Sequence, residues 1–289
     1  MFQQILLSGL AVGAIYALIA LGFTIVFSTI RIVNFAHGEF VMAGGMLYAY
    51  LHAAHGMPIL PAVLLAVACC GLLAWLVYVW GLSGVDPDNH ISQVMITLGV
   101  GITLKGLAQV FIGKETLFPP AFSGSAPVNL GFASISSQAV WVAGSLVVFV
   151  VALHALRQYT RLGISMRAVS INHYAAVLMG ISPRKAAAAS FVIAGIIGGA
   201  AGALFAPLAS THYDNGMFLA IKGFAAAILG GLGSPLGALV GGLILGVTES
   251  LAAGYLSSVY KDAVSLLMLL VVLLARPQGL LGKALLQKL

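Results

Sequence analysis

The sequence predicts an all-α membrane protein, a polytopic transmembrane helical bundle of about 8–9 membrane segments that include broken or re-entrant helices. Hydrophobic residues make up 61% of the 289 residues and charged residues only 7%. A soluble domain needs a charged exterior, about a quarter of its residues. The composition therefore excludes a soluble domain, and residues 1–289 are predicted to form a single transmembrane domain.

Long apolar runs account for most of the predicted segments. A helix needs about 20 apolar residues to cross about 30 Å of hydrocarbon. Seven runs of that kind cover residues 5–28, 58–80, 91–112, 137–156, 186–206, 236–253 and 260–275. The first run is too long for the apolar part of a signal peptide and follows no basic residue, so it is predicted to be a retained span.

Two further apolar segments are short and irregular, Phe35–Leu51 and Met217–Leu232. Both are rich in glycine and alanine, and polar residues interrupt them: His37, Glu39 and Lys222. Freed backbone groups at membrane depth must be surrounded by protein or a water-filled cavity, because lipid cannot form hydrogen bonds with them. These segments are predicted to be broken or re-entrant helices.

Basic residues predict the orientation. The polar loop 157–185 holds five basic residues and no acidic one, and short basic loops stay on the cytoplasmic side. If all the segments cross, the amino terminus, residues 113–136 and residues 212–215 lie outside. The basic residues are Arg157, Arg161, Arg167, Arg184 and Lys185 in the loop, and Arg276, Lys283 and Lys288 near the carboxyl end. The positive charge thus indicates topology and not nucleic-acid binding.

Polar and ionisable residues in apolar segments are costly, so they are candidates for a polar translocation path. The candidates are Asn34, His37, Glu39, Lys222 and Glu249. The alternative is structural, with His37 and Glu39 capping a helix, and with Glu249 and a further intramembrane residue, Lys105, paired or reaching toward the interface. No metal site is predicted, because the sequence has neither an HExxH motif nor a Cys/His cluster.

Glycines spaced four apart predict close helix packing. Gly233, Gly237 and Gly241 would stack small residues on one helix face, which lets helices approach closely in lipid. A tight turn is predicted near Gly233 and Pro235. The adjacent cysteines Cys69 and Cys70 are predicted to pack as small apolar side chains.

Enzyme motifs give no support for catalysis. Residues 81–84 read GLSG, a pattern found around the serine of intramembrane proteases, but the downstream glycine-rich spans contain no histidine to act as its base. A flexible turn is the favoured interpretation. No GxxxxGK[ST] motif occurs, so any dependence on ATP must come from another subunit and no cofactor is predicted.

Three stretches resemble one transporter family: residues 16–45, residues 225–251 and residues 260–282. They read YALIALGFTIVFSTIRIVNFAHGEFVMAGG, AAAILGGLGSPLGALVGGLILGVTESL and YKDAVSLLMLLVVLLARPQGLLG. They are similar to the permease of branched-chain amino-acid ABC importers, the Liv-type H permease, and the similarity runs from end to end. The resemblance implies a multi-pass permease in the cytoplasmic (inner) membrane of a prokaryote. Its partners would be a second homologous permease, two cytoplasmic ATPases, an extracytoplasmic substrate-binding protein and membrane lipid.

The loop 157–185 resembles the cytoplasmic coupling loop of this family. Small residues keep the spacing with which such permeases dock a short helix on their ATPase, although a tyrosine replaces the usual glutamate. The implied coupling residues are Arg167, Tyr174, Ala175, Ala176, Gly180 and Ile181. Small residues on one side of a short helix could enter a cleft on a soluble partner.

The resemblance implies import by alternating access and leaves the substrate open. Branched-chain amino acids, urea, short amides and aromatic acids are all carried by related permeases. The alternative function is an ion-coupled secondary transporter or channel that works without an ATPase, with His37, Glu39, Lys222 and Glu249 as an ion relay.

Overall fold

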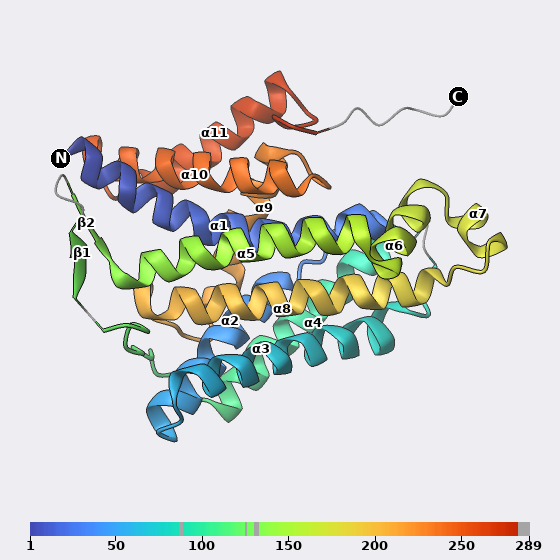
Figure 1. The fold of residues 1–289 in the computed structure, drawn as a ribbon, viewed down its shortest axis with the longest axis horizontal. Helices are drawn as coiled ribbons and strands as arrows, with labels where there is room; N and C mark the ends of the chain where they lie inside the picture. The colour runs from blue at the N-terminus through green and yellow to red at the C-terminus, as the bar shows by residue number, and fades with distance from the viewer. Residues whose placement is uncertain (87–88, 125, 130–132, 283–289) are drawn as a thin grey trace.

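The computed structural model describes residues 1–86, 89–124, 126–129 and 133–282, and it is a bundle of closely packed helices (Figure 1). Apolar runs form helices because a helix satisfies its own backbone hydrogen bonds. Within the described residues, six helices are long and apolar enough to cross a membrane. They are α1 (Phe2–Ile30), α3 (Ile59–Leu76) with its continuation η2 (Val77–Leu82), α4 (His90–Phe111), α5 (Ser137–Tyr159), α8 (Pro183–Ala209) and α10 (Pro235–Tyr255). The predicted fold class is confirmed, and the run 260–275, which was predicted to cross, is not among these six helices.

Shorter elements complete the bundle. The two irregular segments form short helices, α2 (His37–Ala49), which continues as the π-helix η1 (Tyr50–Ala54), and α9 (Asn215–Gly230). The other short helices are α6 (Arg161–Ile171), α7 (His173–Leu178) and α11 (Lys261–Ala275). A small antiparallel hairpin pairs β1 (Pro127–Asn129) with β2 (Ser134–Ser136), with Val128 opposite Ile135.

The two ends of the bundle carry different elements, and the names we give them follow the predicted topology. The amino terminus and the hairpin lie at one end, and α6 and α7 lie at the other (Figure 1). We refer to these as the outer end and the cytoplasmic end. Exposed aromatic residues occur toward both, with Trp141 in the first turns of α5 and Trp80 at the end of η2, as expected of side chains at membrane interfaces. Lys283 and Lys288 lie outside the described residues.

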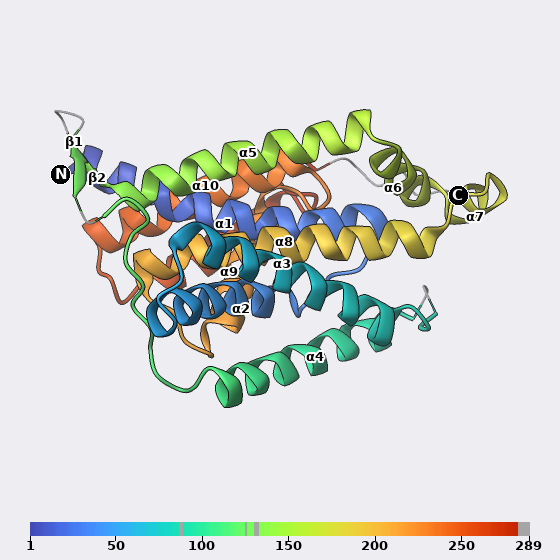
Figure 2. The same cartoon turned by 60° about the horizontal axis from the view of Figure 1, so that its bottom comes forward.

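Helix α1 is the centre of the bundle. Every residue from Gly13 to Val26 is buried, against α10, α8, α9 and α5. Helix α4 lies at the edge and buries little of its surface, which Figure 2 shows clearly. The buried residues of the bundle are therefore supplied chiefly by α1, α2 and α8, and the outer helices leave apolar faces for lipid or for another subunit.

Glycine allows the closest helix contacts. A Cβ at Gly241 would lie 2.1 Å from the Ala226 carbonyl oxygen of α9, and one at Gly237 would lie 2.4 Å from the Gly230 carbonyl oxygen. Gly233 instead lies in the turn between α9 and α10, where its φ of 91° suits a residue without a Cβ. Close approach of this kind supplies the packing energy that lipid does not.

The contact between α8 and α2 is as tight and allows a test. A Cβ at Gly202 would lie 1.8 Å from the Val41 carbonyl oxygen, so Gly202→Ala must push the two helices apart. We expect a loss of about 1–3 kcal/mol or more in stability, measured as a lower melting temperature in detergent. Gly106→Ala on α4 is the control, because nothing lies within 4 Å of its added methyl group. If the two variants had the same melting temperature, the close packing of α8 on α2 would be contradicted.

Candidate functional site

The chain breaks its helical path between α1 and α2. Arg31 ends α1 in the left-handed conformation, with φ 61°, and helix resumes at His37. The Asn34 side chain accepts a hydrogen bond from the backbone N–H of Ala36 at 3.1 Å, and the backbone N–H of His37 donates to the Asn34 carbonyl at 3.1 Å. Asparagine favours such turns because its side chain offers the backbone an alternative partner to the helix.

A second break leads into α9 and meets the first. Ser210 ends α8 with φ 64°, and α9 begins at Asn215 without a side-chain cap. A Cβ at Gly38 would lie 2.3 Å from the Gly216 carbonyl oxygen, so the first turns of α2 and α9 are in contact. We call this contact, with the residues 34–39 that lead into it, the α2–α9 junction.

His37 fixes the start of α2 to α1. Its side chain is buried, and its Nε2 donates a hydrogen bond to the Ile19 carbonyl oxygen at 3.1 Å. The ring fills the space left by Gly22, where a Cβ would lie 2.1 Å from the imidazole, and it meets the Phe23 ring edge-on at 4.8 Å. The environment of His37 is therefore a packed core.

Glu39 lies on the other side of the junction. Its carboxylate packs against Gly216 in the first turn of α9, and its Cγ faces Gly101 of α4. The residue is 7% exposed. One helical turn beyond Gly101, Lys105 forms an ion pair with Asp214, whose pKa is lowered chiefly by that hydrogen bond. Glu39, Lys105 and Asp214 thus gather charge from α2, α4 and the connection before α9.

Lys222 and Glu249 belong to a different cluster. The Lys222 ammonium lies 3.0 Å from Glu249 and 2.6 Å from Asp262, and Tyr16 donates a hydrogen bond to Glu249 at 3.3 Å. Ser265 of α11 donates to Glu249 at 3.3 Å. We call these residues the Lys222 cluster. It joins α1, α9, α10 and α11, so the structure gives Glu249 the paired environment that the sequence left as its alternative.

Sequence reasoning did not identify Asp262 or Asp214 as partners. A signal was present for both. A lone lysine inside apolar sequence needs a carboxylate, and acidic residues are scarce, seven in the whole chain. Asp262 opens the last apolar run, and Asp214 precedes the segment that contains Lys222. Which lysine pairs with which acid depends on how the helices pack.

The coupling loop forms two short capped helices at the cytoplasmic end. Thr160 caps α6, and Asn172 caps α7 by accepting from the backbone N–H of Ala175 at 3.0 Å. Arg167 lies exposed on α6. Gly180 follows the end of α7 with φ 78°, and the Ile181 N–H closes the turn on the Ala176 carbonyl at 2.9 Å.

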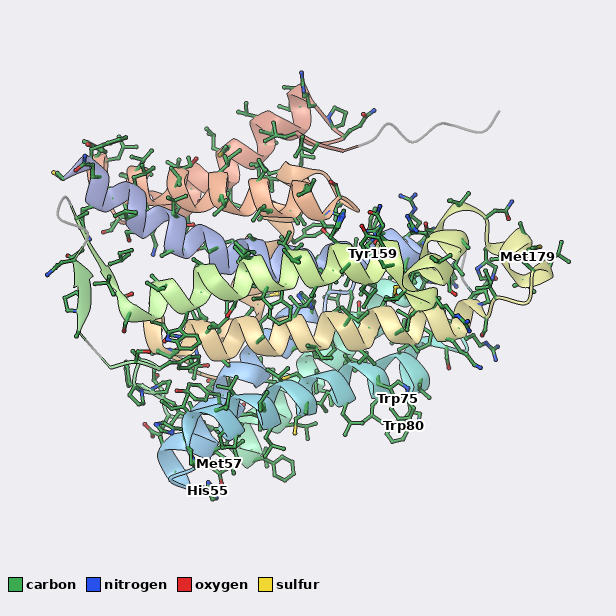
Figure 3. All side chains as sticks on the ribbon, in the orientation of Figure 1. His55, Met57, Trp75, Trp80, Tyr159 and Met179 are labelled. Carbon is green, nitrogen blue, oxygen red and sulfur yellow. The ribbon has the colours of Figure 1, made fainter. Side chains whose placement is uncertain are left out.

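The surface of α7 is apolar. Ala176 faces this chain and is 4% exposed, whereas Leu178 is 87% and Met179 81% exposed. Figure 3 shows Met179 at the extreme cytoplasmic end. Large side chains are therefore exposed on this helix beside the small residues Ala175 and Gly180, which are also exposed. We call the large exposed side chains the α7 apolar cap: Tyr174, Val177, Leu178 and Met179.

A cavity of about 330 Å³ lies near the outer end, between α1, β2, α5 and α8. Its walls include Ser8, Tyr16, Ser136 and Phe205. None of Asn34, His37, Glu39, Lys222 and Glu249 lines it. Through Tyr16 it adjoins the Lys222 cluster.

Comparison with known proteins supports one family. Residues 5–273 match the family described as the permease component of the branched-chain amino acid transport system. The permease protein LivH of Salmonella typhimurium is 34% identical over 98% of this chain and 96% of its own length, and BraD of Pseudomonas aeruginosa is 33% identical over the same shares. Both are named for high-affinity branched-chain amino acid transport. The ribose import permease protein RbsC of Haemophilus influenzae is 27% identical over 91% of this chain and 81% of its own length.

Proposed function

The chain belongs to the family of permease components of branched-chain amino acid transport systems, and from that premise we propose that it imports branched-chain amino acids by alternating access. It is a multi-pass membrane permease of an ABC importer, and ATP hydrolysis lies in separate subunits. Two relatives at 33–34% identity are named for branched-chain amino acids, whereas one at 27% is named for ribose. The higher identity favours the amino acid.

Association with ATPase and substrate-binding partners is a property of this family. We propose the complete set for this chain: two cytoplasmic ATPases, a second homologous permease and one extracytoplasmic binding protein. The apolar faces of α4 and α5 offer surface for the second permease. The hairpin strands β1 and β2 lie at the outer end, where a binding protein would dock. ATP is used by the partner subunits, and we expect no cofactor in this chain.

The observation that supports coupling is the α7 apolar cap. Four large exposed side chains, three on α7 and Met179 directly after it, lie at the tip of the cytoplasmic end and form a surface that a soluble partner would bury. The residues 167–181 around it position the helix. Closure of the ATPase dimer would move α7, and α7 connects directly to α8, which packs on α1 and α2. This gives a rigid route from ATPase to the α2–α9 junction.

We propose that the translocation path passes the α2–α9 junction, near Asn34, His37 and Glu39. Half-length helices that begin at membrane depth place backbone dipoles and polar side chains where a solute can meet them. Lys222 and Glu249 neutralise each other at 3.0 Å, so we assign them to holding α9 against α10.

One experiment tests the function. The tagged chain is purified from native membranes in mild detergent, copurifying subunits are identified by mass spectrometry, and the complex is reconstituted for uptake of radiolabelled L-leucine. We expect two ATPases, a second permease and uptake that requires ATP and the binding protein. Recovery of the chain alone, with uptake driven by an ion gradient, would instead support a secondary transporter.

A further inference from the structure

Glu39 has an unsatisfied carboxylate in a buried position. The residue is 7% exposed, and its Oε2 has no hydrogen-bond partner among the described residues. Leaving a buried charged oxygen without a donor is costly, by about 1–3 kcal/mol or more. The first turn of α9, against which the carboxylate packs, offers only the partial positive charge of a helix end. A cationic ligand group would satisfy it.

Lys105 supplies a positive charge near the Glu39 carboxylate. Lys105 lies on the same face of α4 as Gly101, which faces Glu39, and is within electrostatic reach of the Glu39 carboxylate. Its present partner is Asp214, and the side chains are 39% and 55% exposed. An ion pair this accessible on a helix of the bundle cannot face lipid without a penalty, so water or protein must cover it.

The connections that lead into the α2–α9 junction each begin with a residue in an uncommon backbone conformation. Among the described residues, only Arg31 and Ser210 combine a side chain with positive φ. Each begins one of the two connections that lead into the α2–α9 junction. Strained conformations persist where the surrounding structure enforces them, typically at binding and switch sites.

We propose that Glu39 and Lys105 form the site at which the permease holds the zwitterionic backbone of its substrate, a deepening that rests on the proposed amino-acid function. Glu39 binds the α-ammonium group, and Lys105 binds the α-carboxylate. When the site is empty, Lys105 forms its ion pair with Asp214 instead. The substrate carboxylate replaces Asp214, which is exposed enough to return to water.

The charges favour a zwitterion over other ligands. A simple cation would bind Glu39 but would be repelled by Lys105, and a sugar would need no pair of opposite charges. An amino acid brings an ammonium and a carboxylate together and leaves the net charge of the site unchanged.

Exchanging the two charges of the Lys105–Asp214 pair distinguishes substrate binding by Lys105 from a purely structural ion pair. Lys105→Asp with Asp214→Lys keeps an ion pair between α4 and the connection before α9 but places an acid where the substrate carboxylate would bind. Glu39→Gln keeps the shape of that side chain and removes its charge. The control swap is Lys114→Glu with Glu115→Lys, in an exposed outer segment. Each variant is assembled with its partners and supplied with the same L-leucine-loaded binding protein.

We expect the site swap and Glu39→Gln each to lower L-leucine uptake about tenfold or more, with copurification of the subunits and ATP hydrolysis without leucine unchanged. The control swap should transport within about twofold of the wild-type chain. Wild-type uptake by the site swap, or by Glu39→Gln, would overturn the inference and leave the proposed function intact. Failure of the unmodified complex to take up L-leucine would overturn the amino-acid function and this inference together.

Discussion

Replacing both Leu178 and Met179 by aspartate is expected to release the ATPase subunits and abolish uptake. The two side chains are 87% and 81% exposed in the isolated chain, so their apolar surface becomes favourable only when a partner buries it. Interface anchors of this kind contribute about 2 kcal/mol or more each. A loss of about 4 kcal/mol corresponds to roughly a thousandfold weaker association.

Copurification of the ATPases with the tagged permease measures this effect directly. Val259→Asp is the matched control, because Val259 is 80% exposed but lies in the connection between α10 and α11 at the outer end. The control should retain its ATPases. If the double aspartate variant also retained them at wild-type levels, the α7 apolar cap would not be the docking surface.

Lys222→Met is expected to destabilise the bundle by about 3–5 kcal/mol, because it leaves Glu249 and Asp262 facing each other without a cation. Glu249 is 5% exposed and cannot reach water. The cluster also connects α11, a helix of 15 residues, to the rest of the bundle. When the cluster is lost, we expect α11 to detach from the bundle before the other helices unfold.

Thermal unfolding in detergent, followed by loss of monodisperse protein, measures the change. Lys222→Met combined with Glu249→Gln and Asp262→Asn should recover much of the lost stability, since no buried charge is then left unpaired. Lys114→Met, at an exposed position, controls for removing a lysine as such. A single Lys222→Met variant that melts like the wild-type chain would contradict the structural role of the cluster.

Much of the architecture could be predicted from the order of residues alone. The apolar run 137–156 became α5 (Ser137–Tyr159), and the irregular segment Phe35–Leu51 became the short helix α2 with η1. These features depend on local composition and length, because a segment in lipid must be apolar and must satisfy its own backbone. The basic loop likewise predicted which end carries α6 and α7.

The exposed side of the coupling helix α7 could not be predicted from the sequence. Spacing placed Ala175, Ala176 and Gly180 on a small-residue surface, but in the structure Ala176 faces this chain and Gly180 lies past the helix end. A helix of six residues ends where a positive φ allows it to end, and its rotation is set by packing on α8. Ala175 and Gly180 stay exposed together with the larger side chains of Tyr174, Val177, Leu178 and Met179.

Sequence by itself indicated a helical membrane protein, the positions of the six helices long enough to cross and the two irregular segments, whereas the run 260–275, predicted to cross, became the 15-residue helix α11. Those properties follow from solvation by lipid, which each segment experiences separately. Only the tertiary structure decided that Lys222 pairs with Glu249 and Asp262, and that Glu39 packs against Gly216 near Lys105. Such pairs join residues far apart in the chain, and a contact across helices depends on the rotation and depth of both, which no single segment specifies.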